Sequence, residues 1–459
     1  RSASSGLVDA QSNALRSIPC GFPSWTVAMR TPNATGGDGT GKGGREPVAP
    51  DSHAEQNASR APTPDEAMKQ TVDRTARRTQ SFTESVIREM TRVAKEHDAV
   101  NLAQGFPDFP APELLKEAAA AAIRADVNQY AITWGAPNLR RALARKYAVR
   151  YGMQVDPERE ITVTCGATEA MAAVMLALID PGDEVVILEP FYENYGPDAV
   201  LCAASPVFLT LEAPAYRLQR ERLEAAITTR TKAIAINTPN NPTGRVFDRE
   251  ELEAVASLCI EHDLVAITDE IYEHILYQGE HIPLATLPGM AERTVTVSGL
   301  SKTFSITGWR VGTIVAPPDL TDAIRKVHDF LTVGSPAPLQ EACAVGLDQL
   351  GPDYYASLSA GYAERGGLLL TALRDAGFRC AMPEGAYYIL ADFSELSDED
   401  DTTFAKRLAR EAGVASVPGS SFFSTPESGR SLVRFAFCKK HDTLREAGGR
   451  LRRFAGRGG

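Results

Sequence analysis

Residues 294–312 read TVTVSGLSKTFSITGWRVG, a β-branched run followed by a stretch that isolates two cations. The run 294–298 has the composition that is typical of a strand. Lys302 and Arg310 follow, eight residues apart, among side chains that are otherwise small, hydroxylic or apolar. These apolar flanks argue against an ordinary surface lysine after a loop. The stretch therefore places two cations just beyond the end of a predicted strand.

Five similar runs precede this strand, and helical patterns such as ATEAMAAVMLALI (167–179) and REELEAVASLCIEH (249–262) separate them. The runs are ITVT (161–164), EVVIL (184–188), PVFLTL (206–211), AIAI (233–236) and LVAIT (264–268). Short strands that are apolar on both faces and alternate with helices predict an α/β fold with a mostly parallel sheet. After residue 338 the chain is helical again, and AYYILADF (386–393) and SLVRFAF (431–437) predict strands of a smaller α+β unit.

The composition excludes several classes of protein. The chain has 459 residues, 43% of them hydrophobic, and a formal net charge of -11, which predicts a soluble globular protein and no nucleic-acid partner. No apolar run is long enough to cross a membrane. The seven cysteines are scattered without metal-ligand spacing, so we expect reduced thiols, no metal site and a cytoplasmic location.

Residues 1–75, rich in Gly, Ser, Pro, Ala and Asn, predict a disordered N-terminal extension. A helix is expected to start between Thr83 and Val86.

Polar residues follow four of the predicted strands directly. CGATEAM (165–171) turns into a helix whose first N–H groups could hold a phosphate, although a plain turn also explains its glycine. NTPNNPTGRVF (237–247) crowds three Asn and two Pro into one loop, which turn chemistry explains in part. Asp269 opens DEIYEHI (269–275), where a buried carboxylate needs a cationic partner or caps the next helix. Together with the opening stretch, these loops form a candidate site, because ligands bind at the carboxyl ends of parallel strands.

Four motifs, NNPTG, DEIY, SKTFSITGWRVG and VRFAF, occur in this order along the chain. Together they resemble the motifs of the class I/II aminotransferase family, the fold-type I pyridoxal-phosphate enzymes. NLAQGFPDFPAP, NQYAITWGAPNLRRALA and EPFYENYGP are most similar to the kynurenine/glutamine/methionine-type group. The resemblance covers roughly Ser81 to the C-terminus.

The resemblance implies an α/β fold-type I structure and pyridoxal 5'-phosphate as the cofactor. We expect a large domain over residues 121–335, with a mostly parallel seven-stranded sheet covered by helices. Residues 336–459 would form the smaller α+β domain, to which residues 76–120 contribute.

The resemblance also assigns roles to residues around the cofactor ring. Lys302 is the expected nucleophile, forming a Schiff base with the aldehyde and later moving a proton; burial and neighbouring cations favour its neutral form. Asp269 would keep the ring nitrogen protonated. Tyr272 and Asn241 would hydrogen-bond the phenolic oxygen, and Tyr192 would stack on the ring, although it could equally be an ordinary core aromatic.

Further residues are expected to hold the phosphate. Arg310 suits it, because a guanidinium binds phosphate bidentately and stays charged. Gly166, Ala167, Thr168 and a serine would complete the cradle. Some relatives carry serine where this chain has Gly299, so either Ser298 or Ser301 could make that contact. Tyr130 resembles a tyrosine that such enzymes donate across a dimer interface, which implies a homodimer with shared active sites.

The substrates implied by the resemblance are an L-amino acid and a 2-oxo acid, which exchange an amino group in a ping-pong reaction. Arg434 would bind the α-carboxylate, with Asn237 and the backbone near Gly105. No arginine outside the motifs stands out for a distal carboxylate, so we expect a neutral or aromatic donor. The alternative is a PLP-dependent lyase or β/γ-substituting enzyme that also forms carbon-carbon bonds, possibly on S-adenosylmethionine. A non-catalytic amino-acid sensor is less favoured, since no helix-turn-helix pattern is present.

Overall fold

The computed structural model describes residues 75–456. Contacts divide the chain into two units, Arg1–Ala67 and Met68–Gly459, and every described element belongs to the second unit. The predicted N-terminal extension, residues 1–75, lies outside the described residues except for its last position. The first described element is the 3-10 helix η1 (Arg77–Gln80). The first α-helix, α2 (Val86–Glu96), begins after the N-cap Ser85, at the end of the predicted range.

A seven-stranded, mostly parallel sheet forms the centre of the large domain, as expected. In spatial order its strands are β2 (Ile161–Thr164), β8 (Gly312–Val315), β7 (Thr294–Gly299), β6 (Val265–Asp269), β5 (Thr231–Asn237), β3 (Glu184–Glu189) and β4 (Ser205–Thr210). Strand β8 runs antiparallel to both of its neighbours, and the remaining pairs are parallel. Asn237 pairs with Asp269, and Asp269 with Val297. The carboxyl ends of β5, β6 and β7 therefore meet at one edge.

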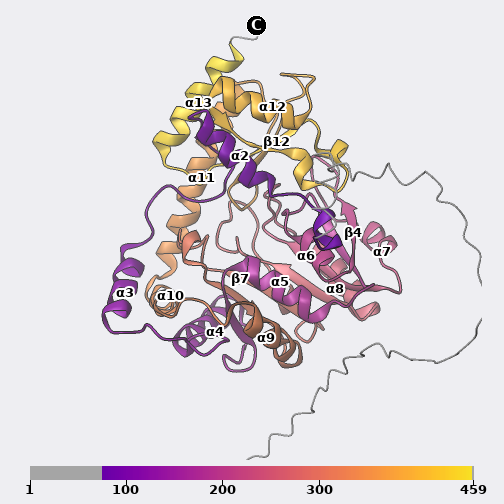
Figure 1. The fold of residues 1–459 in the computed structure, drawn as a ribbon, viewed down its shortest axis with the longest axis vertical. Helices are drawn as coiled ribbons and strands as arrows, with labels where there is room; N and C mark the ends of the chain where they lie inside the picture. Colours follow the sequence, from indigo (N-terminus) through magenta and orange to yellow (C-terminus); the bar gives the residue numbers. More distant parts are fainter. Residues whose placement is uncertain (1–74, 457–459) are drawn as a thin grey trace, which may run out of the picture. The chain divides into compact units, whose positions relative to one another are not determined.

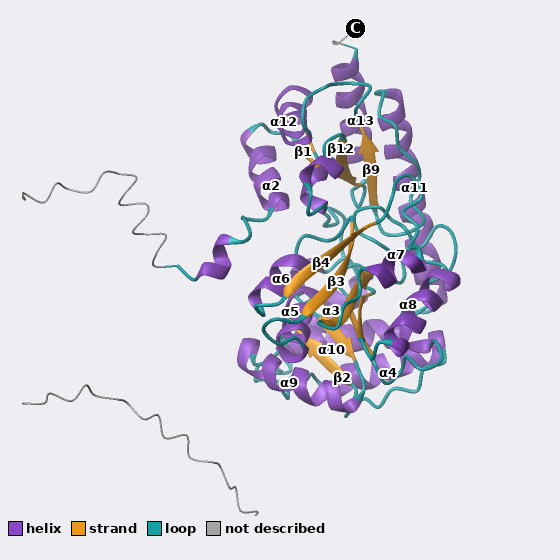
Figure 2. Cartoon of the chain, turned by 90° about the vertical axis from the view of Figure 1, so that its right-hand side faces the viewer, coloured by secondary structure: helices purple, strands orange, loops and turns teal. Residues whose placement is uncertain are grey.

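Helices cover both faces of this sheet, because alternate residues of each strand point to opposite sides. In β5, Ala233 and Ala235 face one buried cluster, whereas Ile234 and Ile236 face another. The first cluster is closed by α5 (Ala167–Leu178), α6 (Tyr195–Leu201) and α9 (Pro318–Thr332), and the second by α7 (Arg220–Ala225) and α8 (Arg249–Glu261). Figure 2 shows α6 and α9 on one side of the strands and α7 and α8 on the other.

Local signals fix the ends of several of these helices. Helix α8 starts with a capping box, in which the Asp248 side chain accepts from the N–H of Glu251 and the Glu251 side chain accepts in return. Helix α4 (Pro137–Tyr151) has proline in its first turn and ends at Gly152, which is left-handed with φ 69°. The residues at these helix ends are thus of the types that favour helix termini.

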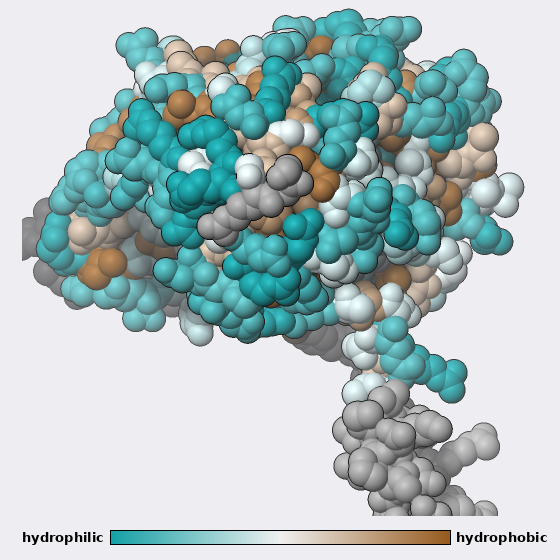
Figure 3. Space-filling model, turned by 90° about the horizontal axis from the view of Figure 1, so that it is seen from above, coloured by the Kyte–Doolittle hydropathy of each residue, from teal (hydrophilic) through white to brown (hydrophobic). Residues whose placement is uncertain are grey.

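The smaller domain lies at the end of the unit that carries the C-terminus (Figure 1). Its three-stranded antiparallel sheet has the order β11 (Val417–Pro418), β12 (Leu432–Ala436), β9 (Tyr388–Asp392), and β1 (Val100–Asn101) pairs in parallel with β10 (Val414–Ala415). Its core also contains side chains of α2, α11 (Pro352–Asp375), α12 (Asp401–Arg407) and α13 (His441–Ala455). Seen from that end, the surface is mostly hydrophilic with scattered hydrophobic residues (Figure 3).

Helices α3 (Glu113–Arg124), α4 and α10 (Ala337–Gln349) pack together beside β2 and β8. Cys343 of α10 shares a buried cluster with Ile161 of β2. The packing of these helices differs from the domain boundaries expected at residues 120 and 335. Helix α3 continues past residue 120, and α10, which follows residue 335, packs with strands of the large domain. The remaining short turns are η2 (Leu284–Thr286), η3 (Thr307–Trp309), η4 (Leu408–Ala412), η5 (Gly419–Phe422) and η6 (Pro426–Gly429).

Three sequence expectations concern thiols, metals and membranes. The six cysteines between residues 75 and 456 are free. Over the same range, no group of three or more His, Cys, Asp or Glu side chains is arranged to hold a metal ion. Among the described helices, none combines the length and the apolar character that crossing a bilayer requires.

Candidate active site

A cleft opens at the edge of the sheet where β5, β6 and β7 end. Its cavity volume is about 370 Å³, and its walls come from the N-terminal segment, the large-domain loops and the smaller domain. The walls include most of the predicted site residues: Gly105, Ala167, Thr168, Tyr192, Asn237, Asn241, Asp269, Tyr272, Ser301, Lys302, Arg310 and Arg434. The fold therefore brings together residues that are more than 300 positions apart in the sequence.

Lys302 follows β7 and projects into this cleft. Its Nζ donates to the carbonyl oxygen of Gly105 at 3.3 Å. Burial lowers the pKa of Lys302 to about 8, and the cations Arg310 and Arg434 contribute to the decrease, while Cys438 and Asp269 oppose it. A lysine in this state supplies a neutral amine near neutral pH, as nucleophilic and proton-transfer chemistry requires.

Asp269 is the last residue of β6 and is buried at the floor of the cleft. Its carboxylate accepts a hydrogen bond from the Tyr195 hydroxyl at 2.6 Å and from the N–H of Ile271 at 3.2 Å. Burial raises the pKa of Asp269, and the bonds from Tyr195 and Ile271 oppose that increase. A cation brought beside this carboxylate would stabilise its ionised form further. The sequence reasoning missed Tyr195, which looked like one more aromatic of EPFYENY.

Tyr272 lies in the loop after Asp269, and its hydroxyl is 2.9 Å from the Tyr388 hydroxyl. Burial raises the pKa of Tyr272 well above its ordinary value, so the phenol is neutral and available for hydrogen bonding. Tyr388 also lies beneath Arg434, whose guanidinium carbon is 4.3 Å from the tyrosine ring centroid. Tyr388 was not predicted; its place in AYYILADF signals only a buried strand residue.

Arg434 reaches the cleft from β12 of the smaller domain. It is fully buried, with Nη1 donating to Asn241 Oδ1 at 2.8 Å and Nη2 donating to the Ala103 carbonyl at 2.6 Å. Its Nε has no hydrogen-bond partner among the described residues. A buried guanidinium with neutral partners and a free donor forms a site for a carboxylate.

Arg310 lies against the start of α5. Gly166 precedes the helix with φ +84°, and a Cβ built on it would lie 2.1 Å from Arg310 Nη2. The same guanidinium donates to the carbonyl oxygens of Thr307 at 3.0 Å and Cys165 at 3.4 Å. Glycine is required here, because it allows both the positive φ and the close approach of the arginine. A fixed cation beside a helix N-terminus is a phosphate-binding arrangement.

Ser298 and Ser301, the two serines left open by the sequence, separate clearly in the structure. The Ser298 hydroxyl donates to Glu273 at 3.0 Å and is not part of the cleft wall. Ser301 does line the cleft. Of the two serines, Ser301 is therefore the one that the structure places on the cleft wall. Tyr130 is also absent from the cleft wall, and its side chain is exposed.

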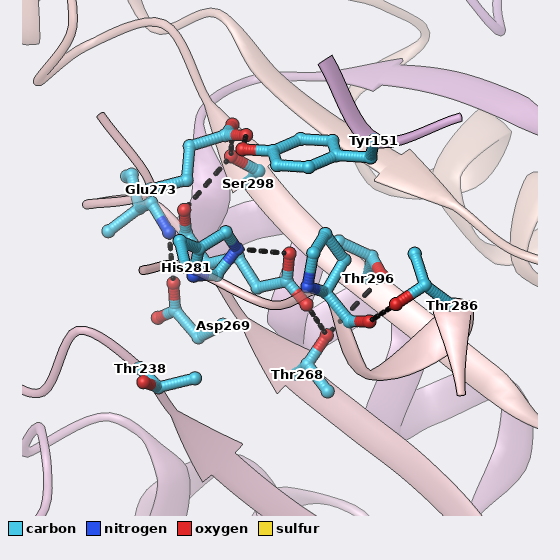
Figure 4. Close-up of polar contacts among 12 residues, drawn as sticks. Tyr151, Thr238, Thr268, Asp269, Glu273, His281, Thr286, Thr296 and Ser298 are labelled. Atoms are coloured by element: carbon cyan, nitrogen blue, oxygen red, sulfur yellow. Dashed lines mark hydrogen bonds and ion pairs between the residues drawn. The ribbon is translucent and has the colours of Figure 1, made fainter. Parts of the chain in front are cut away.

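A buried polar network lies behind the cleft-facing loop (Figure 4). Glu273 accepts from Lys146 at 2.5 Å and from Tyr151 at 2.6 Å, in addition to Ser298. Although burial alone would raise it, the charge of Lys146 holds the pKa of Glu273 well below its ordinary value. Glu270 is 2.9 Å from both Thr268 and His281. Asp269 and Tyr272 thus face the cleft, while the alternating Glu270 and Glu273 anchor the loop from behind.

Comparison with known proteins agrees with this geometry. Residues 97–451 match the family model for aminotransferase class I and II. The chain is 40% identical to the probable N-succinyldiaminopimelate aminotransferase DapC of Mycobacterium tuberculosis, covering 82% of this chain and 98% of the relative. The structure of the M. tuberculosis N-succinyldiaminopimelate aminotransferase superposes with a TM-score of 0.80 at 40% identity, covering 82% of this chain and 99% of that one.

Two further relatives have different named substrates. Human kynurenine--oxoglutarate transaminase 1 is 36% identical over 80% of this chain and 94% of its own. The methionine aminotransferase of Escherichia coli K12 is 38% identical over 80% of this chain and 95% of its own. The relatives named here are all aminotransferases, and none supports the lyase alternative.

The fold and the cleft define a fold-type I transferase, and the matches show that the chain belongs to the aminotransferase class I and II family. It is a pyridoxal-phosphate-dependent aminotransferase, as the sequence motifs implied. The residues present fit that cofactor: a lysine with a lowered pKa, a buried carboxylate at Asp269, and an arginine packed against Gly166 where only a hydrogen fits.

Proposed function

We propose that this enzyme transfers the amino group of an L-amino acid to a 2-oxo acid in the cleft described above, with Lys302 as its proton-transfer residue. One observation carries the proposal: the half-buried Lys302 lies in the same cavity as two arginines that contact no carboxylate among residues 75–456. Burial and these two cations lower the pKa of the lysine to about 8. The cofactor, when bound, supplies the electron-accepting ring that stabilises charge at the substrate α-carbon.

We assign the following roles to the other residues of the cleft. Asp269, supported by Tyr195, holds a proton on the ring nitrogen, and Tyr272 and Asn241 are hydrogen-bond partners for the ring oxygen. Tyr192 is the proposed stacking partner of the ring. Arg310, Ser301, Gly166, Ala167 and Thr168 bind the phosphate. Arg434, with Asn237 and the backbone of Gly105, binds the substrate α-carboxylate.

A homodimer with shared active sites is part of the proposal. Tyr130 is 86% exposed and Phe330 is 91% exposed. Their two segments are adjacent, because His328 of α9 is 2.8 Å from the Thr133 carbonyl oxygen. Large exposed aromatic side chains on adjacent segments favour contact with a second copy of the chain, which would bring Tyr130 to the neighbouring phosphate. We further propose a cytoplasmic location, which the free thiols support.

The central test is Lys302→Ala. We expect the purified variant to lose the visible absorbance of lysine-bound cofactor and to lose transamination by several orders of magnitude, because the nucleophile and the proton carrier are both removed. Lys232→Ala, at an exposed position of β5, is the matched control. A retained absorbance band in Lys302→Ala would refute the assignment.

A further inference from the structure

We propose that Arg88 binds an anionic group at the far end of the substrate side chain. The inference rests on the proposed transamination and specifies its substrate class. Arg88 belongs to the first turn of α2 and lines the same cleft as Lys302, although 214 residues separate the two in the sequence. Arg88 belongs to none of the sequence motifs, and the proposal replaces the expected neutral or aromatic donor with one that carries an anionic group.

A count of charges in the cleft leads to this assignment. Its walls contain three arginines, Arg88, Arg310 and Arg434. None of them forms an ion pair with a carboxylate of the described residues. In the proposed function, the cofactor phosphate takes Arg310 and the α-carboxylate takes Arg434. Arg88 is then left without an anion, so a substrate with one more negative group would complete the set.

The local setting of Arg88 makes the absence of a partner informative. The N-terminus of a helix carries partial positive charge, so a cation in the first turn is unfavourable. One turn later, Arg92 is paired with Glu84 through two hydrogen bonds of 2.6 and 3.0 Å. No such bond to the Arg88 guanidinium occurs in the described part of the chain. Arg88 is exposed and, after Arg92, contributes to the lowered pKa of Glu84, but no carboxylate of the described residues lies within ion-pair distance of its guanidinium.

Glu193 also lines the cleft, and an ion pair between it and Arg88 is the competing explanation. Its carboxylate accepts a hydrogen bond from the hydroxyl of Ser85, the N-cap of α2, rather than from Arg88. The apolar groups of Ile87, Phe106 and Met171 line the cleft as well. The substrate that fits these walls has an apolar stem and an anionic end. The apolar residues of the cleft would therefore contact the stem of the substrate side chain, and Arg88 would bind its anionic end.

The test compares amino donors that differ only at the end of the side chain, assayed with the cofactor-loaded enzyme. Suitable pairs are L-glutamate with L-glutamine and L-2-aminoadipate with L-norleucine. In Arg88→Ala, we expect kcat/KM for the acidic donors to fall about 10- to 100-fold, mainly through KM, since a charge-assisted hydrogen bond is lost. The neutral donors should change less than about twofold, and Arg88→Lys should recover part of the loss. Arg92→Ala is the matched control on the same helix and should leave all donors unaffected.

Two results would overturn the inference. One is a wild-type enzyme that uses the neutral member of each pair as well as the acidic one. The other is that Arg88→Ala lowers kcat/KM equally for both members of each pair and that Glu193→Gln does the same. That result would assign Arg88 to an ion pair with Glu193. Either result leaves transamination intact. Failure of every donor to convert the cofactor would instead refute the proposed function.

Discussion

Lys302 illustrates how a single residue obtains its reactivity from neighbours far away in the sequence. Burial is the main cause of the lowered pKa of the lysine, and two cations add to it: Arg310, eight residues away, and Arg434, which comes from the smaller domain. Asp269 opposes them. The fraction of neutral amine at physiological pH therefore depends on residues of both domains.

The pH dependence of cofactor capture follows from this balance. Below a pKa of about 8 the Lys302 amine is protonated and cannot attack an aldehyde. We expect the rate of reconstitution of the cofactor-free enzyme to rise with pH, about tenfold per unit at first, and to level off above pH 8. Stopped-flow absorbance measures this rate directly.

A variant tests the cause of that profile. Arg434→Met removes a cation that lowers the pKa of Lys302, so the profile should move to higher pH, whereas Arg434→Lys should keep its position. A profile that is identical in all three proteins would contradict the role given to Arg434.

At the residue scale, the sequence predicts those site residues that belong to a recognisable local motif. Lys302, Arg310 and Arg434 stand in short motifs whose chemistry is readable, and all three reach the cleft. Tyr195 and Tyr388 could not be found, because an aromatic whose hydroxyl is hydrogen-bonded to Asp269 or Tyr272 looks the same in sequence as a core aromatic. Their roles depend on the convergence of side chains from separate elements.

At the scale of elements, the loop after β6 has two faces. Asp269 and Tyr272 point into the cleft, and Glu270 and Glu273 connect the loop to α4 and β7 through the network of Figure 4. The buried pair between Lys146 and Glu273 joins α4 to this loop. The network therefore fixes the positions from which the cleft residues act.

Glu273→Ala should destabilise the fold more than any surface ion pair would. Removing one partner leaves Lys146 buried and uncompensated, at an expected cost of about 3–5 kcal/mol in the free energy of unfolding. Glu89→Ala, which breaks the exposed pair with Lys406, should cost less than about 1 kcal/mol. Urea denaturation compares the two variants. Equal losses would show that the buried network does not anchor the loop.

The strands that the sequence missed have a common physical cause. The six predicted strands of the large sheet are β-branched runs with turns at both ends, and all six are present. Strand β8 has four residues and continues directly from the lysine motif, so no turn signal separates it. Strands β10 and β11 have two residues each and exist only through pairing with β1 and β12.

For the whole molecule, the main consequence of the fold is that the cleft is shared between two domains. The large domain supplies Lys302 and Arg310, and the smaller domain supplies Arg434. The hydrogen bond from Arg434 to Asn241 crosses between them. A substrate held at both places therefore connects the domains, and assembly of the complete site further depends on the proposed second subunit.

Phe330→Asp tests that second subunit. A charge in place of this exposed aromatic ring should weaken the homodimer by about tenfold or more, because the burial of the ring between subunits is lost. Ile260→Asp, at an exposed position of α8 on the opposite face of the sheet, is the control. Sedimentation velocity gives the association state of each protein. A wild-type enzyme that sediments as a monomer at every concentration would refute the dimer.

The lifetime of the protein is a further consequence of the buried Arg434. Its Nη atoms donate to Asn241 and Ala103, but its Nε has no partner among the described residues and carries a desolvation cost. Carboxylates that bind there stabilise the folded state in proportion to the logarithm of their concentration. Proteases act on the unfolded fraction, so we expect degradation to slow when amino acids and oxo acids are abundant. The amount of this enzyme in a cell would then follow the supply of its own substrates.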